Sequence, residues 1–229
     1  MNTGDKAIRS QNNLLTTIAW QIGDKVEYAL EGSVFMGGAV VQWLRDELGI
    51  IQTAAECDLM AEGVSDNGGV YLVPAFSGLG APHWDPYARG TILGLTRGAN
   101  RHHLCRAALE SIAYQITDLI DCMRSDSGIE LKQLNVDGGA ANSDPLMQFQ
   151  ADLLRVTVAR PESTESTAMG AAFLAGLAVG FWQDLKEITQ RRRIDTTFEA
   201  QMARASVDHL VSTWQRAVKR SKEWIDETP

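Results

Sequence analysis

The stretch from Leu134 to Gln150, LNVDGGAANSDPLMQFQ, has the residue types of a site that binds phosphate or a nucleotide. Its first residues indicate the end of a buried strand. Gly138 and Gly139 then permit backbone dihedral angles and close approaches that a β-carbon would forbid. Ser143 or Asp144 can cap a helix that has a proline in its first turn. A strand, a glycine turn and a helix N-terminus can together bind an anion, although the two glycines could instead only make a tight connection.

A second glycine pair, Gly37 and Gly38, lies inside a helical pattern that runs from Ser33 to Leu48. Ser33 is a candidate N-cap, and apolar residues recur on one face of the segment. A glycine inside a helix costs about 1 kcal/mol relative to alanine. Two adjacent glycines therefore indicate that another group comes close to the backbone at this point.

No complete catalytic or metal-binding motif occurs in the sequence. The phosphate-binding loop and the dinucleotide-binding fingerprint are both missing. The adjacent His102 and His103 lack further ligands at fixed spacing, so we interpret them as a helix start and not as zinc ligands. Ser77 lacks the Gly-x-Ser-x-Gly turn of a serine hydrolase. Four carboxylates could do acid–base work, but the sequence pairs none of them and favours solvated or capping roles: Asp85, Glu110, Asp137 and Asp144.

The composition is that of an ordinary globular protein, with 45% hydrophobic and 22% charged residues among 229. The formal net charge of −8 argues against a general nucleic-acid-binding protein, because neutralising phosphates requires a basic surface. A small phosphorylated ligand is not excluded, since backbone amides in a local pocket can bind it.

Three cysteines, Cys57, Cys105 and Cys122, are odd in number and lack metal-like spacing, which favours a reduced, cytoplasmic compartment. The longest apolar stretch, from Ala168 to Trp182, is shorter than the roughly 20 residues that span a bilayer. No signal peptide opens the sequence. We therefore expect a soluble intracellular protein without a membrane partner.

Hydrophobic periodicity predicts the elements that position these residues. Strands are predicted at residues 14–21, 25–32, 71–78, 90–97, 134–136 and 156–161. Helices are predicted at 33–48, 53–66, 102–123, from 143 or 144 onward, at 166–181 and at about 201–227. The helix at 102–123 has the clearest apolar stripe. A loop rich in glycine, proline and tryptophan follows residue 78, and the arginines at 191–193 are expected to form a solvated patch.

Hairpins come first and strand–helix alternation comes later, which predicts an α/β fold with a mixed sheet flanked by helices. No internal repeat, low-complexity tract or linker is visible. We therefore predict a single domain over residues 1–229 with a helical tail at about 201–227. The many glycines and alanines of residues 166–181 should let that helix pack very closely against its neighbours.

Several long motifs carry a resemblance to a known family. VYLVPAFSGLGAPHWDPYARGTILGLTRG, at residues 70–98, is followed by HHLCRAALESIAYQ at 102–115. Together with NTGDKA near the start, YALEGSVF, and VDGGAANSDPLMQFQ, these segments resemble the FGGY family of carbohydrate kinases. They are most similar to its members that phosphorylate glycerol. The resemblance covers essentially the whole chain and weakens after about Arg191.

The resemblance implies a ribonuclease-H-like fold of the actin-like ATPase type, in two domains separated by a cleft. ATP would bind mainly to the C-terminal domain and glycerol mainly to the N-terminal domain. This chain resembles the C-terminal domain alone, with the N-terminal domain absent. The family's general-base aspartate and Mg²⁺ aspartate belong to the N-terminal domain, so the resemblance assigns no catalytic residue and no metal ligand here. A homo-oligomer is implied for the full-length protein.

The resemblance also implies where adenosine would bind. Gly38 and Gln42, in GGAVVQ, match the glycine and glutamine that line the family's adenosine site. Their spacing of four places both on one helix face. Gly37, in contrast, is interpreted as a packing residue.

In the glycine turn, Gly139 matches the second glycine of the family's DGG motif. The family's polar contact four positions later falls on Ser143, where the glycerol-phosphorylating members usually have asparagine. Asn142 lies one place earlier, so which of the two side chains contacts the nucleotide stays open.

The function implied by the resemblance is transfer of the ATP γ-phosphoryl group to glycerol, giving sn-glycerol 3-phosphate and ADP. The chain by itself is expected to be inactive. One alternative is another FGGY kinase that acts on a pentulose or a different polyol. The other is a non-catalytic nucleotide-binding or oligomerisation module that has kept the fold.

Overall fold

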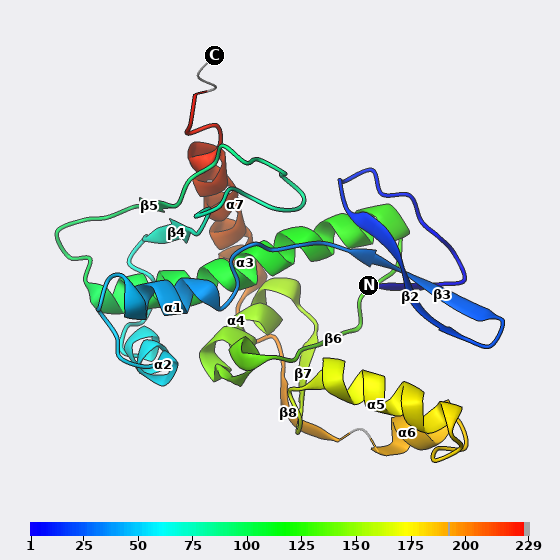
Figure 1. Cartoon of the computed structure of the whole chain (residues 1–229). Coiled ribbons are helices and arrows are strands. Elements are labelled where there is room, and N and C mark those ends of the chain that lie inside the picture. Colours follow the sequence, from blue (N-terminus) through cyan, green and yellow to red (C-terminus); the bar gives the residue numbers. More distant parts are fainter. Residues whose placement is uncertain (192, 227–229) are drawn as a thin grey trace. The chain divides into compact units, whose positions relative to one another are not determined.

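The computed structural model describes residues 1–191 and 193–226, and the chain divides into two compact units (Figure 1). The larger unit contains residues 1–131 and the C-terminal segment from Met202, and the smaller unit contains residues 132–201. The sequence predicts one domain with no internal division. The division arises because residues 132–201 build a sheet of their own. That the two units act as one domain stays a prediction.

The larger unit begins with a three-stranded antiparallel sheet in the order β1-β3-β2. Its strands are β1 (Asn2–Gly4), β2 (Leu15–Ile22) and β3 (Lys25–Glu31). The predicted hairpin is thereby confirmed. Its turn places Gly23 at a φ of +58°, in the left-handed region that glycine adopts without steric cost.

Two short strands, β4 (Tyr71–Val73) and β5 (Thr91–Leu93), pair antiparallel. Both are shorter than predicted, because Pro74 has no amide to donate after β4 and Gly94 turns the chain at a φ of +81° after β5. The loop between them is irregular, as its glycines and prolines indicate.

Helix α1 (Ala39–Asp46) begins six residues after Ser33, the predicted N-cap. The carbonyl oxygen of Ser33 instead accepts a hydrogen bond from the Ala81 amide, 3.1 Å away, and this contact holds it outside the helix. The next helix, α2 (Ala54–Glu62), is shorter than its prediction of 53–66. It is capped by Thr53, whose hydroxyl accepts a hydrogen bond from the Glu56 amide.

The long helix α3 (Arg101–Ser127) is the centre of the larger unit, and α1, α2 and β4 all contact it (Figure 1). The predicted helix start at the histidine pair is confirmed, because Asn100 and His103 form a capping box at its first turn. At the other end, Gly128 closes the helix at a φ of +65°. Such a left-handed C-terminal glycine is a common helix stop.

The C-terminal helix α7 (Arg204–Ser221) packs into the larger unit. Trp214 is 1% exposed, stacks on Tyr114 with ring centroids 5.1 Å apart, and donates a hydrogen bond to Asp118. The predicted C-terminal helix is therefore present, with its apolar stripe covered by α3 and β4, and its role as a tail of a single domain stays a prediction. Residue 227, where the prediction ended, lies outside the described residues.

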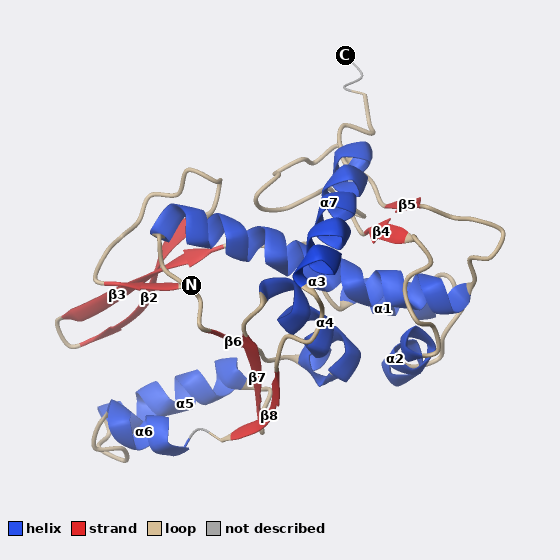
Figure 2. Ribbon diagram, turned by 180° about the vertical axis from the view of Figure 1, so that it is seen from behind, coloured by secondary structure: helices blue, strands red, loops and turns tan. Residues whose placement is uncertain are grey.

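The smaller unit contains a mixed sheet in the order β6-β7-β8, with β6 parallel and β8 antiparallel to β7 (Figure 2). This confirms the predicted α/β class with a mixed sheet. Its elements are β6 (Gln133–Asn135), the 3₁₀ turn η1 (Gly139–Asn142), α4 (Asp144–Leu154), β7 (Thr157–Pro161), α5 (Ser166–Ala178), α6 (Leu185–Arg191) and β8 (Ile194–Phe198).

Helix α5 does not show the expected close packing: none of its residues is buried, and only one of its glycines makes a tight contact. A β-carbon added at Gly176 would meet the Trp182 indole at 2.5 Å, whereas one at Gly170 would meet nothing within 4 Å. Arg191 and Arg193 are exposed, as predicted, and Arg192 lies outside the described residues. None of the helices in the described part of the chain is long and apolar enough to cross a membrane.

Candidate functional site

The first candidate surface is the opening turn of α1 in the larger unit. Val40 and Leu44 lie on the buried face of the helix, whereas Gly38 and Gln42 are exposed on another face. Gly38 has helical dihedral angles and its carbonyl accepts hydrogen bonds from the Val41 and Gln42 amides. No side chain caps this helix start. The face that carries Gly38 and Gln42 is thus open backbone followed by one exposed amide side chain.

Gly37 does not have the packing role that the sequence indicates. Its carbonyl accepts a hydrogen bond from the Val40 amide, 3.1 Å away. A β-carbon added at Gly37 would meet no atom within 4 Å. The interpretation of Gly37 as a packing residue is therefore wrong.

The second candidate surface is the glycine turn between β6 and α4 in the smaller unit. Gly138 has a φ of +78° and a ψ of 174°, a combination that side chains rarely allow. Its amide donates to the Thr164 carbonyl at 2.9 Å, and its carbonyl accepts from the Ala141 amide at 3.1 Å. A β-carbon added at Gly139 would meet nothing within 4 Å. The space beside Gly139 is therefore left open by the rest of the unit.

Ser143 and Asn142 have opposite environments at the start of α4. Ser143 is 8% exposed, and its hydroxyl accepts the Leu146 amide, so it is the N-cap of the helix. Asn142 is exposed. Within the described residues no hydrogen bond engages its side chain. The cap is therefore Ser143 and not Asp144, and Asn142 presents its side chain to solvent.

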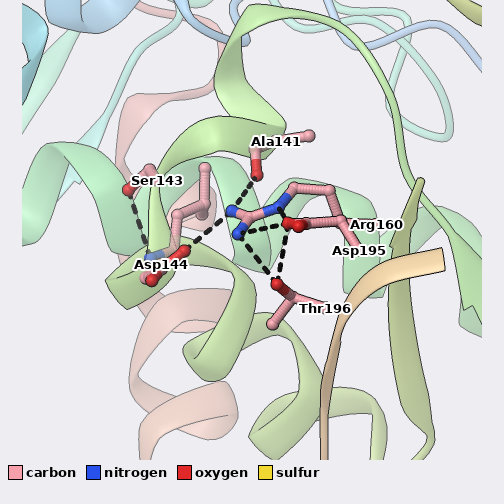
Figure 3. Close-up of polar contacts among 7 residues, drawn as sticks. Ala141, Ser143, Asp144, Arg160, Asp195 and Thr196 are labelled. Carbon is pink, nitrogen blue, oxygen red and sulfur yellow. Dashed lines mark hydrogen bonds and ion pairs between the residues drawn. The ribbon is translucent and has the colours of Figure 1, made fainter. Parts of the chain in front are cut away.

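Arg160, on β7, donates hydrogen bonds to this turn and to the first residue of α4 (Figure 3). Its Nη1 donates to the Ala141 carbonyl at 3.1 Å and to the Asp144 carboxylate at 2.7 Å. Its Nε and Nη2 both donate to Asp195 at 3.3 Å, and Nη2 also donates to the Thr196 hydroxyl. Sequence reasoning missed this residue, although an arginine inside the apolar run VTVARP is a signal that could have been followed.

The carboxylates that could do acid–base work each have their own partner or face solvent. Glu110 is buried and forms an ion pair with Arg106 at 2.9 Å; burial raises its pKa, while the hydrogen bond from Arg106 lowers it. Asp85 accepts hydrogen bonds from two amides of its own loop. Asp144 pairs with an arginine of β7, and Asp137 is exposed. Each has a structural or solvated role, as the sequence indicates.

The five residues that the sequence marks as nucleotide contacts lie in two sets. Gly38 and Gln42 belong to the larger unit, on one face of α1, and Gly139, Asn142 and Ser143 belong to the smaller unit, on one turn. Exposed amide side chains beside open backbone can donate and accept hydrogen bonds. Among residues 1–191 and 193–226, no three His, Cys, Asp or Glu side chains gather as a metal site.

Comparison with known proteins places this geometry in a family. The profile described as "FGGY family of carbohydrate kinases, C-terminal domain" matches residues 1–179. The glycerol kinase of Burkholderia ambifaria is 58% identical over 228 residues, which are 100% of this chain and 46% of that protein. The chain spans about half the length of the curated relatives it matches.

Solved structures show the same relationship. The crystal structure of Plasmodium falciparum glycerol kinase with ADP has a TM-score of 0.89 and 39% identity, covering 96% of this chain and 44% of that one. The ligand-bound xylulose kinase from Lactobacillus acidophilus has a TM-score of 0.77 and 26% identity, covering 96% and 43%. With its profile match extending over more than half of its residues, the chain belongs to the FGGY family of carbohydrate kinases and corresponds to the C-terminal domain of that family.

Proposed function

We propose that this chain is the nucleotide-binding C-terminal domain of a kinase that transfers the ATP γ-phosphoryl group to glycerol, giving sn-glycerol 3-phosphate and ADP. The observation that carries the proposal is the likeness to the P. falciparum glycerol kinase solved with ADP, at a TM-score of 0.89 over 96% of the chain. The 58% identity to the B. ambifaria glycerol kinase supports the same acceptor.

The adenine nucleotide is proposed to contact Gly38, Gln42, Gly139 and Asn142, with Ser143 supporting the turn as its helix cap. Two features support this assignment. A β-carbon added at Gly139 would have no protein atom within 4 Å, so the backbone there is accessible to a flat ligand. Gln42 and Asn142 are both exposed amides, which can donate and accept hydrogen bonds with adenosine.

Phosphoryl transfer depends mainly on positioning and on neutralising charge, with Mg²⁺ bridging phosphate oxygens when it is bound. The residues of this chain are proposed to bind and orient the nucleotide only. The general base, the Mg²⁺ ligands and the glycerol-binding residues are assigned to an N-terminal domain, which curated relatives of about twice this length have room for. We therefore expect residues 1–229 alone to have no glycerol-dependent ATPase activity.

The location and assembly of the kinase are also proposals. All three cysteines are unpaired thiols, and two of them, Cys57 and Cys105, are buried, which supports a reducing compartment such as the cytoplasm. We expect the full-length kinase to be a homo-oligomer, which size-exclusion chromatography with light scattering would test.

The acceptor is tested by assaying the full-length kinase against glycerol, a pentulose and a four-carbon polyol. Glycerol should give the highest kcat/KM. The lower similarity to the xylulose kinase, 26% against 39% for the glycerol kinase structure, supports glycerol over a pentulose. A preference for the pentulose would contradict the proposal and leave the family assignment intact.

The nucleotide site is tested by calorimetry of ADP binding to two variants of the full-length kinase. Gln42→Ala removes an exposed amide, and Gly139→Val fills space that the protein leaves empty. We expect both to weaken ADP binding, with valine worse because its branched side chain occupies ligand space. Gln52→Ala and Gly170→Val are matched controls, since Gln52 is exposed and Gly170 also has no atom within 4 Å. If neither variant weakens binding, the assignment of the nucleotide site to these residues fails.

A further inference from the structure

Arg160, on β7, joins the turn before α4 to the start of β8, about 50 residues further along the chain (Figure 3). Nη1 reaches the Ala141 carbonyl inside η1 and the Asp144 carboxylate at the start of α4. Nε and Nη2 reach Asp195 and Thr196 at the start of β8. Every nitrogen of the guanidinium group is therefore engaged, and only one of the groups it reaches belongs to the backbone.

The environment of this guanidinium indicates a fixed geometry. Its side chain is 12% exposed, against 66% for Asp144 and 50% for Asp195. The Cζ atom also lies 5.4 Å from the centre of the Phe198 ring. A hydrogen bond from Thr196, together with those from Arg160, lowers the pKa of Asp195, which keeps that partner ionised. A planar fork of donors loses little rotamer freedom for each bond it makes, so this arrangement suits arginine and not lysine.

The hydrogen bond from Arg160 to the Ala141 carbonyl links this arginine to the glycine turn. This carbonyl lies between Gly139 and Asn142, the two positions at which the turn is open to a ligand. Other contacts also hold the turn: the Gly138 amide bonds to Thr164, Ser143 caps α4, and the Ala141 side chain is buried. Asp144 follows directly, and it is held by the same guanidinium group. Arg160 is thus a single side chain, from another strand, that contacts both the turn and the first residue of α4.

We propose that Arg160 is a positioning residue for the nucleotide: it holds the Gly139–Asn142 turn in the conformation that presents Gly139 and Asn142 to adenosine. This inference rests on the proposed function. Arg160 itself touches no ligand and takes no part in the chemical step. Its effect reaches nucleotide binding through the Ala141 carbonyl and the Asp144 carboxylate.

Two measurements on the full-length kinase test this role. Amide hydrogen exchange over residues 138–147, without ligand, measures how far Arg160 stabilises the conformation of the turn. Calorimetry with ADP measures the effect on the Kd. In Arg160→Gln, we expect exchange of these amides to accelerate and the Kd for ADP to rise about tenfold, the size of one charge-assisted hydrogen bond. The KM for glycerol should stay within about twofold. Arg160→Lys should fall between wild type and Arg160→Gln, because one ammonium can replace only part of the fork.

The controls separate positioning from general stability. Arg193→Gln removes an equal charge from an exposed arginine of the same unit and should leave both readouts unchanged. Asp195→Asn weakens the hold at β8 without touching the turn, and it serves as a milder variant if Arg160→Gln does not fold. Unchanged exchange in Arg160→Gln overturns the inference, as does faster exchange with an unchanged Kd. Wild-type protein that binds no ADP refutes the proposed function and the ligand part of this inference, while the exchange data still decide whether Arg160 holds the turn.

Discussion

Asp118 lies in the middle of α3, where α7 packs against that helix. One carboxylate oxygen accepts a hydrogen bond from the Trp214 indole at 2.8 Å. Burial raises the pKa of Asp118 to about 6 from a model-peptide value of 3.8, and the neighbouring Asp121 adds to the rise. The Trp214 hydrogen bond and Lys222 act in the opposite direction but do not cancel it. Replacing Asp118 with asparagine removes the charge and keeps an oxygen that can accept from the indole.

The size of the effect follows from the two pKa values. A difference of about 2 units corresponds to roughly 3 kcal/mol between the two protonation states. Because the folded-state pKa is the higher one, the folded protein favours protonated Asp118. The favourable contribution is present in full below about pH 4 and is lost as the pH rises through about 6. Asp118→Asn should therefore raise the free energy of unfolding at pH 8 by up to about 3 kcal/mol, and much less near pH 4.

Urea unfolding of wild type and variant at half-unit steps from pH 4.5 to pH 8 measures this difference. Asp208→Asn, which removes an exposed carboxylate from α7, is the matched control and should show little change. A gain from Asp118→Asn that does not grow with pH would refute the assignment of the effect to a buried charge. A loss of stability at pH 8 would show that the ionised carboxylate, through Trp214, stabilises the fold.

Three further outcomes follow from the packing and the turn geometry. Gly94→Ala should destabilise the fold by several kcal/mol more than Gly49→Ala, as urea unfolding would show: both have positive φ, but only at Gly94 would a β-carbon collide with a backbone carbonyl. Trp214→Ala should cost about 3–5 kcal/mol of unfolding free energy, because the indole is buried between helices; a cost below about 1 kcal/mol would contradict that packing. Asn142→Ala should raise the Kd for ADP without changing the melting temperature, whereas Ser143→Ala should lower stability by about 1 kcal/mol through loss of the cap. The reverse pattern would show that Ser143 contacts the nucleotide.

Local patterns predicted the elements that depend on near neighbours. The apolar stripe of residues 102–123 became α3, and the Gly23 turn joined β2 to β3, because helix periodicity and turn chemistry act over a few residues. The DGG turn was predicted for the same reason, and the cap of the following helix was limited to Ser143 or Asp144, of which the structure shows Ser143. Motif wording over residues 70–115 pointed to the family, which the profile match shows.

Predictions that needed distant partners were less successful. The start of α1 was placed at Ser33, but the Ala81 amide, 48 positions further along the chain, takes the Ser33 carbonyl out of the helix. The packed position of α7 depends on Trp214 meeting Tyr114, a contact that no local pattern reveals. That Ser143 is buried while its neighbour Asn142 is exposed also could not be read from the sequence.

The amino-acid sequence by itself thus determined where the chain turns, which residues are free of a β-carbon, and to which kinase family the chain belongs. Tertiary structure alone decided that α7 covers α3, that Asp118 is desolvated, and that Arg160 meets Ala141 and Asp195. The physical reason is the separation along the chain over which each interaction acts. Backbone conformation and helix capping act between neighbouring residues, whereas burial and hydrogen bonding between distant side chains exist only once the chain has folded.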